Sequence, residues 1–182
     1  MNFRNLLIIA VCIVSESSYA QTWLSKNTQV RIFSSTPIED IDAKTNTAVL
    51  ALNEKSGKVL MKLQIKSLNF PKKLMQEHFN ENYMESDKYP TAEFEGVIQN
   101  IPDFNIHKAS EHKIKGTIMI HGVKRNIEVP ISLTTSKDKV VGQSKFKVKC
   151  ADYNVEIPKI VLKNIAEDIE VTISAELNPV KK

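Results

Sequence analysis

The chain has 182 residues, enough for one domain with a sizeable core. Its net charge is +4, from 25 basic and 21 acidic side chains, and the lysines are scattered between apolar residues. Because no basic cluster with interleaved aromatics occurs, composition excludes nucleic acid as an expected partner.

Residues 1–20 have the organisation of a secretory signal peptide. Arg4 supplies a positive start, residues 6–14 are an apolar run, and Ser18-Tyr19-Ala20 is a small-x-small cleavage site. Such a short run cannot cross about 30 Å of hydrocarbon, so a membrane anchor is disfavoured. We expect residues 21–182 to form the exported domain, in a periplasm or cell envelope or secreted.

Cys150 is the only cysteine after residue 20, so the exported chain has no partner for an intrachain disulfide. It continues the apolar series Phe146 and Val148. Free cysteine commonly behaves as a small buried hydrophobe. We therefore predict that Cys150 packs in the core.

Most of the chain alternates between apolar and polar residues, the pattern of half-buried strands. The clearest example has Val59, Met61, Leu63 and Ile65 on one face of residues 58–68. About eight such segments occur, at residues 28–35, 46–52, 58–68, 92–102, 112–120, 123–133, 140–150 and 167–177.

One segment is helical instead. Met75, Phe79 and Tyr83 recur every four residues and share one face of a short helix at residues 72–85. Pro90 ends the pattern, because the residue before a proline is pushed out of the α region. We expect this helix to border one end of the sheet, with the three side chains facing inward and Tyr89-Pro90 turning the chain back into a strand.

Two features punctuate the later strands. His121-Gly122 separates two alternating runs and predicts a tight hairpin with a positive φ at the glycine. Pro130 falls on the polar face of the next run, where it cannot donate a ladder hydrogen bond. An edge or bulge position is therefore expected for it.

No helices separate the strands, so the sheet is predicted to be antiparallel and the fold all-β. Eight strands with one apolar face each can stack as a sandwich or close into a barrel. A barrel of that size can hold one small ligand. The alternation alone does not distinguish the two architectures.

Four segments, in order and behind a signal peptide, resemble the YceI family of exported bacterial proteins. They are MQEHFNENYMESDKYPTAEFEG, GTIMIHGVKRNIEVPISL, FKVKCADYNVEIP and DIEVTISAEL. The resemblance covers nearly all of residues 21–182. It implies an eight-stranded antiparallel, lipocalin-like barrel with one short helix.

The resemblance also implies function: a non-enzymatic carrier or buffer that encloses a polyisoprenoid or isoprenoid quinone, with no other cofactor. Contact with a membrane and homodimer formation stay open. Small inward residues such as Gly116, Gly142 and Ala175 would leave room inside, and the aromatics cluster near the helix. We assign ligand contact to Phe70, Met75, Phe79, Tyr83, Tyr89, Phe94, Ile118, Ile120, Val129, Phe146 and Val148.

No catalytic or metal-binding motif is present. The chain has no H-E-x-x-H, no CxxC and no G-x-S-x-G, so no catalytic or metal residue is assigned and an enzyme is not expected. Two alternatives remain. One is a packed barrel that binds an envelope protein through loops 101–111 and 152–165. The other, the weakest, is an enzyme or a haem or metal protein that uses His78 or His121.

Overall fold

The computed structural model describes residues 21–35, 40–156 and 168–180. The predicted signal peptide therefore lies outside the described residues, as does much of the loop predicted at residues 152–165.

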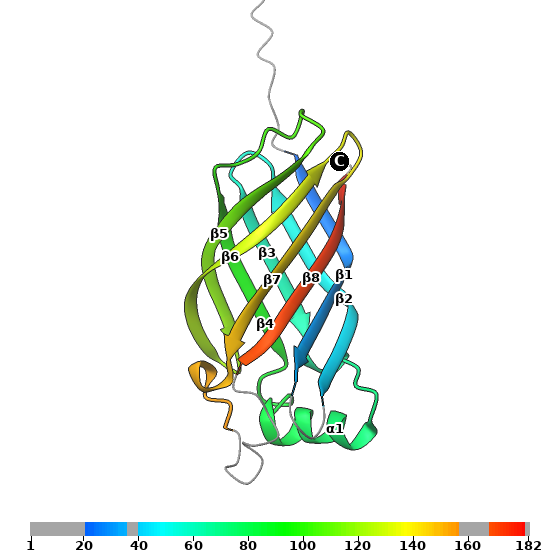
Figure 1. Cartoon of the computed structure of the whole chain (residues 1–182), viewed down its shortest axis with the longest axis vertical. Helices are drawn as coiled ribbons and strands as arrows, with labels where there is room; N and C mark the ends of the chain where they lie inside the picture. The colour runs from blue at the N-terminus through cyan, green and yellow to red at the C-terminus, as the bar shows by residue number, and fades with distance from the viewer. Residues whose placement is uncertain (1–20, 36–39, 157–167, 181–182) are drawn as a thin grey trace, which may run out of the picture.

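Eight antiparallel strands close into one barrel in sequence order (Figure 1). Neighbouring strands pair all the way round, and β1 pairs with β8 to complete the circle. This confirms the predicted all-β fold and decides for a barrel over a sandwich. The strands are β1 (Thr22–Ser34), β2 (Ile41–Asn53), β3 (Lys58–Gln64), β4 (Thr91–Gln99), β5 (Ala109–Ile120), β6 (Val123–Thr135), β7 (Val140–Lys149) and β8 (Asp168–Pro179).

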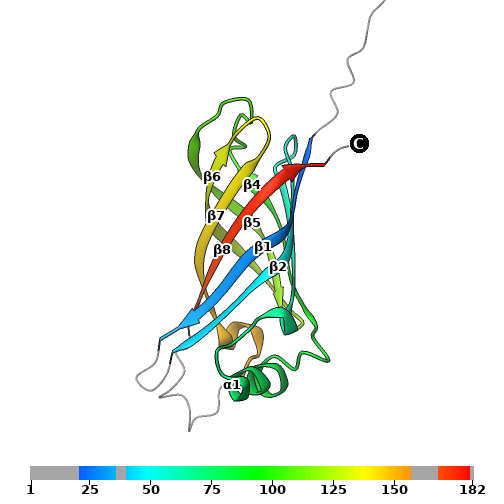
Figure 2. The same ribbon diagram turned by 90° about the vertical axis from the view of Figure 1, so that its right-hand side faces the viewer.

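The barrel is elongated, and a helical segment lies across one end of it (Figure 2). That segment consists of α1 (Lys73–His78) and a π-helical turn, η2 (Phe79–Tyr83). It agrees with the helix predicted at residues 72–85. Two 3₁₀ turns, η1 (Ile65–Ser67) and η3 (Cys150–Tyr153), follow the ends of β3 and β7. Among the described residues, no helix is long and apolar enough to cross a membrane.

The prediction of a strand through residues 58–68 is wrong in its second half. β3 ends at Gln64, and the chain turns through η1 before Asn69 forms an isolated bridge with Lys44. The alternation runs on to Ile65, which is buried although it already lies in η1. Leu68 is also buried, but it comes three residues later and breaks the period of two.

The interior contains two apolar clusters. The far cluster lies at the end opposite α1 and centres on Leu52, Leu133 and Leu177, each at most 2 % exposed. There Trp23 stacks on Phe104 with ring centroids 6.3 Å apart, and the Trp23 indole N–H donates to Glu54. The near cluster, under α1, is built on Val30, Ala43, Ala48, Leu63 and Leu68.

The hairpin between β5 and β6 forms as predicted. His121 has φ 50° and Gly122 has φ 74°, as a two-residue turn between twisted strands requires. Tyr89 covers this turn, since its ring centroid lies 4.4 Å from that of His121. A Cβ on Gly122 would lie 2.7 Å from the Tyr89 ring, so both backbone conformation and space demand glycine.

The outer face carries many ion pairs, although Val49, Leu60 and Val97 are also exposed on it. Glu93 and Glu95 on β4 accept from Lys62 and Lys58 on β3, at 2.8 and 2.7 Å. They are the two carboxylates whose strand spacing predicts a solvated outward face. Nearer the helix end, Arg31 makes two bonds to Asp42, and this contact lowers the pKa of the Asp42 carboxyl.

Replacing Gly116 by alanine is expected to destabilise the barrel by about 1–3 kcal/mol, the usual cost of overpacking. A Cβ there would lie 2.3 Å from the Glu95 carbonyl oxygen and 2.6 Å from the Gly96 Cα, and backbone cannot move aside easily. Urea unfolding would measure the change.

Gly142→Ala is the matched control, because its Cβ would meet only the Leu133 and Ile131 side chains, at 3.4 and 3.7 Å. Equal stability of the two variants would contradict the close approach of β4 to β5.

Candidate functional site

A cavity of about 580 Å³ occupies the barrel between the two apolar clusters. Its wall is apolar along most of its length, with Val59, Ile114 and Ala175 towards the far end and Val171 and Phe79 towards the helix. The cavity runs from the helix end into the barrel and stops before Trp23 and Phe104, where the far cluster fills the interior.

The room inside arises where two small residues face each other across neighbouring strands. Gly142 on β7 pairs with Ala175 on β8, and both line the cavity. Gly96 and Gly116 pair in the same way, but the Phe94 ring lies over them, because a Cβ on either would come within 2.9 Å of its Cζ. The Gly96–Gly116 pair therefore makes room for the Phe94 ring, whereas the Gly142–Ala175 pair leaves open volume in the cavity.

The helical segment is fastened over the cavity mouth by side chains that bond to backbone. Gln76 accepts from the Phe70 N–H at 3.0 Å and donates to the Leu68 carbonyl at 2.7 Å. Asn80 donates to the Gln76 carbonyl and accepts from the Ser86 hydroxyl. These bonds fix the rotation of the helix about its own axis.

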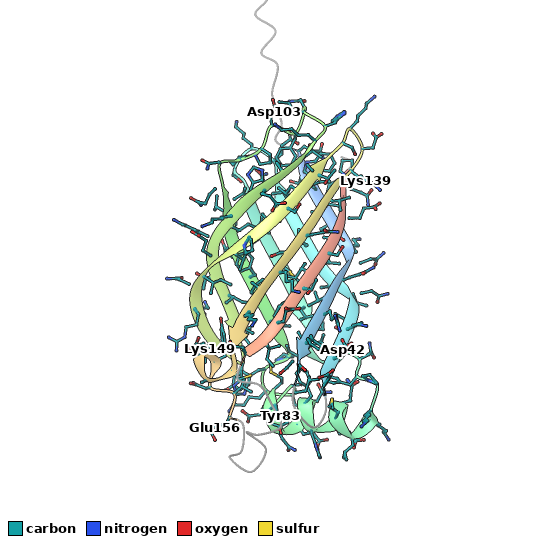
Figure 3. The ribbon with its side chains drawn as sticks, in the orientation of Figure 1. Asp42, Tyr83, Asp103, Lys139, Lys149 and Glu156 are labelled. Atoms are coloured by element: carbon teal, nitrogen blue, oxygen red, sulfur yellow. The ribbon has the colours of Figure 1, made fainter. Side chains whose placement is uncertain are left out.

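Met75, Phe79 and Tyr83 all line the cavity, and Figure 3 labels Tyr83 at the end of the barrel that carries the helix. A spacing of four residues drifts steadily around a 3.6-residue helix. The wider π turn, in which the Met84 N–H donates to the Phe79 carbonyl, counters that drift and keeps Tyr83 on the inner face. Phe79 also packs on Phe70, with centroids 4.7 Å apart.

The structure brings ten of the eleven residues assigned to ligand contact around one cavity. They are Phe70, Met75, Phe79, Tyr83, Phe94, Ile118, Ile120, Val129, Phe146 and Val148. Tyr89 is the exception. It packs against the His121–Gly122 turn and is not part of the cavity wall, because the chain has already left the mouth when it reaches Pro90.

Sequence reasoning did not assign several of the lining residues. Val30 and Ile32 on β1 and Ile169, Val171 and Ile173 on β8 face the cavity as fully as the assigned residues do. Alternation marks their inward face, but it does not tell which level of the barrel each one reaches. The closure of β1 on β8 decides that level.

Polar groups are few: three lie at the mouth, and Glu93, Gln143 and Ser144 line the cavity from the strands. Lys72 and His78 come from the helical segment and Lys149 from the end of β7, which Figure 3 labels at the same end as Tyr83. No group of three or more His, Cys, Asp and Glu side chains in the described part of the chain could hold a metal ion. An apolar interior with a few polar groups at its opening is suited to an apolar chain with a polar head.

His121 ties three elements together beside the mouth. Its Nε2 lies 2.9 Å from the Glu85 carboxylate and its Nδ1 lies 3.1 Å from the Tyr153 carbonyl oxygen. The helical segment, the β5–β6 turn and η3 therefore share one side chain, which is only 9 % exposed. Its ring is engaged in structure, which leaves it poorly placed for the metal or haem role considered from sequence.

Cys150 lies where β7 ends, half-buried and against the cavity. Burial, and then the nearby Asp168 carboxylate, raise the pKa of its thiol. Burial likewise raises the pKa of Tyr153, which is 3 % exposed and also lines the cavity. The predicted burial of Cys150 is therefore only partial, because its neighbour on one side is the cavity and not packed core.

A family model described as a YceI-like domain matches residues 23–177. No functionally curated protein matches the chain.

Solved structures with the same fold are distant in sequence. A polyisoprenoid-binding domain from Saccharophagus degradans, implicated in plant cell wall breakdown, superposes with a TM-score of 0.76 at 14 % identity, over 89 % of this chain and 100 % of that one. BcnA from Burkholderia cenocepacia gives 0.69 at 13 %, over 82 % and 95 %. The YceI protein of Campylobacter jejuni gives 0.59 at 18 %, over 100 % and 92 %. At these identities, the likeness shows the fold alone.

Cys150 should react with iodoacetamide at pH 8 more slowly than free cysteine, because its raised pKa leaves less of the reactive thiolate. The measurement is the alkylation rate by mass spectrometry in a Cys12→Ser background. Urea-unfolded protein is the control and should react at the rate of a free thiol. A native rate equal to the unfolded rate would show that the thiol does not pack at the mouth.

Proposed function

The chain belongs to the YceI family, and from this premise we propose that it binds a long isoprenoid lipid or quinone inside its barrel as a non-enzymatic carrier or buffer. The single observation that carries the proposal is the deep apolar cavity that opens under the helical segment. The polyisoprenoid binding described for the Saccharophagus domain, which has the same fold, supports the choice of ligand class.

Burial of the tail would supply the affinity. At about 25 cal/mol per Å², a tail that buries roughly 300 Å² of apolar surface gains about 7 kcal/mol before the cost of ordering it. The branched aliphatic side chains of β1, β6 and β8 and the rings of Phe70 and Phe79 offer such a surface. An isoprenoid chain is apolar throughout and needs no hydrogen-bond partner inside the barrel.

The polar head would lie at the mouth, where Lys72, His78 and Lys149 border the cavity. Tyr83 belongs to the same rim and offers a hydroxyl beside an apolar ring. These groups suit a head that either carries negative charge or accepts hydrogen bonds.

A binding protein fits this arrangement better than an enzyme does, because the described residues of the wall include no nucleophile hydrogen-bonded to a base. The alternative of a packed barrel that binds another protein is less well supported, since it rests on a filled interior and the cavity occupies the middle of this one. We place the carrier in the cell envelope, where the sequence of residues 1–20 would direct it.

Native mass spectrometry tests the proposal directly. Protein purified from its producing cell should carry an added mass equal to a prenyl lipid or quinone, or should gain one when incubated with a series of polyprenols. Only the apo mass under both conditions would refute isoprenoid binding.

Phe79→Asp should lower ligand retention on the order of tenfold or more, because it places a carboxylate in the apolar wall beside Phe70. Glu81→Lys alters the exposed face of the same turn and should retain ligand normally. Retention by native mass spectrometry is compared with the thermal unfolding midpoint, so that loss of binding is separated from loss of fold.

Phe79→Leu keeps an apolar side chain and should restore most of the retention. Equal effects of the substitutions at Phe79 and Glu81 would mean that the helical face is not part of the binding site.

A further inference from the structure

The barrel wall is incomplete between β6 and β7. Their ladder has only four paired positions, from Thr135↔Val140 to Ser132↔Gln143. Residues 123–131 of β6 and 144–149 of β7 are all described, yet they have no paired position with each other. We call this stretch the open seam. Figure 1 shows β6 curving away from β7 towards the end that carries α1.

Pro130 lies where the ladder stops. Its carbonyl accepts from the Ser144 hydroxyl at 2.6 Å, so this edge of the residue faces β7. The N–H and C=O of one strand residue point to the same neighbouring strand. The missing N–H of Pro130 is therefore the donor that the next rung would have needed, and the residue occupies the edge position expected of it.

The other side of each strand is fully paired. β6 pairs with β5 at twelve positions and β7 pairs with β8 at ten. Two fully paired strand units, β5–β6 and β7–β8, thus flank the open seam. Among the described residues, only hydrogen bonds donated by side chains join β6 to β7 and η3 at its ends. These are Ser144 to the Pro130 carbonyl, and Arg125 to the Asp152 carbonyl at 2.9 Å. Arg125 and Pro130 are five positions apart on β6, or about 16 Å along the strand.

A second interruption in the same barrel is closed differently. The β2–β3 ladder also has four paired positions, but beyond it Lys44 and Asn69 exchange two backbone hydrogen bonds, of 3.1 and 2.9 Å. The open seam has no such backbone bridge among the described residues. It is filled by the apolar side chains of Ile127, Val129, Phe146 and Val148.

The cavity wall is thin at this place. Gln143, at the last paired position, is exposed, and it nevertheless lines the cavity together with its inward neighbours Gly142 and Ser144. Val129, Phe146 and Val148 line it from the two sides of the seam. Among the residues that the structure describes, only a layer of apolar side chains therefore lies between the cavity and the outside along the seam.

We propose that the open seam is the passage by which the isoprenoid chain enters and leaves the barrel sideways, between β6 and β7. This inference rests on the proposed function and concerns its route. The mouth is covered by the fastened helical segment, so a long chain would have to thread past Met75, Phe79 and Tyr83 end first. At the seam, the strands part without breaking a backbone hydrogen bond.

A covalent tether across the seam tests the route. Glu128→Cys and Lys147→Cys lie opposite each other if the register of Ser132↔Gln143 is continued. In a background with Cys12→Ser and Cys150→Ser, a reducible bismaleimide would join them. Stopped-flow uptake of a dansylated C20 prenyl amine should slow on the order of tenfold, with the final amount bound unchanged. Reduction of the linker should restore the rate in the same molecules.

Lys147→Cys with Glu170→Cys is the matched control, because these residues pair across the continuous β7–β8 ladder and share one of the two cysteines. Its tether should leave uptake unchanged. Phe146→Ala, which removes the largest side chain in the seam, should speed release. If the protein tethered across the seam takes up the probe as fast as the control tethered across β7–β8, the sideways route is wrong, while the proposed function stands. An untethered protein that takes up no probe would overturn the proposed function and the route with it.

Discussion

Closure of the sheet, with β1 hydrogen-bonded to β8, is the constraint on which the rest of this structure depends. An open sheet would expose one apolar face and two unpaired edges. Closing it buries the inward side chains against one another and removes the outer edges. It also brings Val30 and Ile32 beside Val171 and Ile173, residues separated by most of the chain. The cavity wall exists only because these two strands meet.

Closure does not make the barrel uniform along its axis. At the far end, Trp23, Phe104 and three nearly inaccessible leucines fill the interior. In the middle, the Gly142–Ala175 pair removes side-chain volume, and the wall stays apolar without being packed. At the near end, the helical segment covers the opening and is held by Gln76 and Asn80. The barrel is thus filled with side chains at its far end, and at its near end hydrogen bonds hold the helical segment over the cavity.

Two pairs of neighbouring strands in the wall, β2–β3 and β6–β7, have only four paired positions each. Both lose their pairing towards the helix end. The β2–β3 interruption is bridged by backbone because the chain between β3 and α1 runs past β2, which lets Asn69 reach Lys44. Between β6 and β7, Pro130 removes a donor, and apolar side chains take the place of hydrogen bonds.

The sequence by itself determined the class of fold, the face that each strand buries, the helix with Met75, Phe79 and Tyr83 inward, and the tight turn at His121–Gly122. Local spacing fixes these features, because the periods of strand and helix decide which side chains share a face. Spacing could not tell that Ile65 already lies in a turn, since its side chain is buried there as it would be in a strand. Only the tertiary structure decided that the interior holds a cavity, that Tyr89 lies outside it and that β6 parts from β7. Each of these depends on how strands pair and on what packs against them, which the alternation within a single strand does not encode.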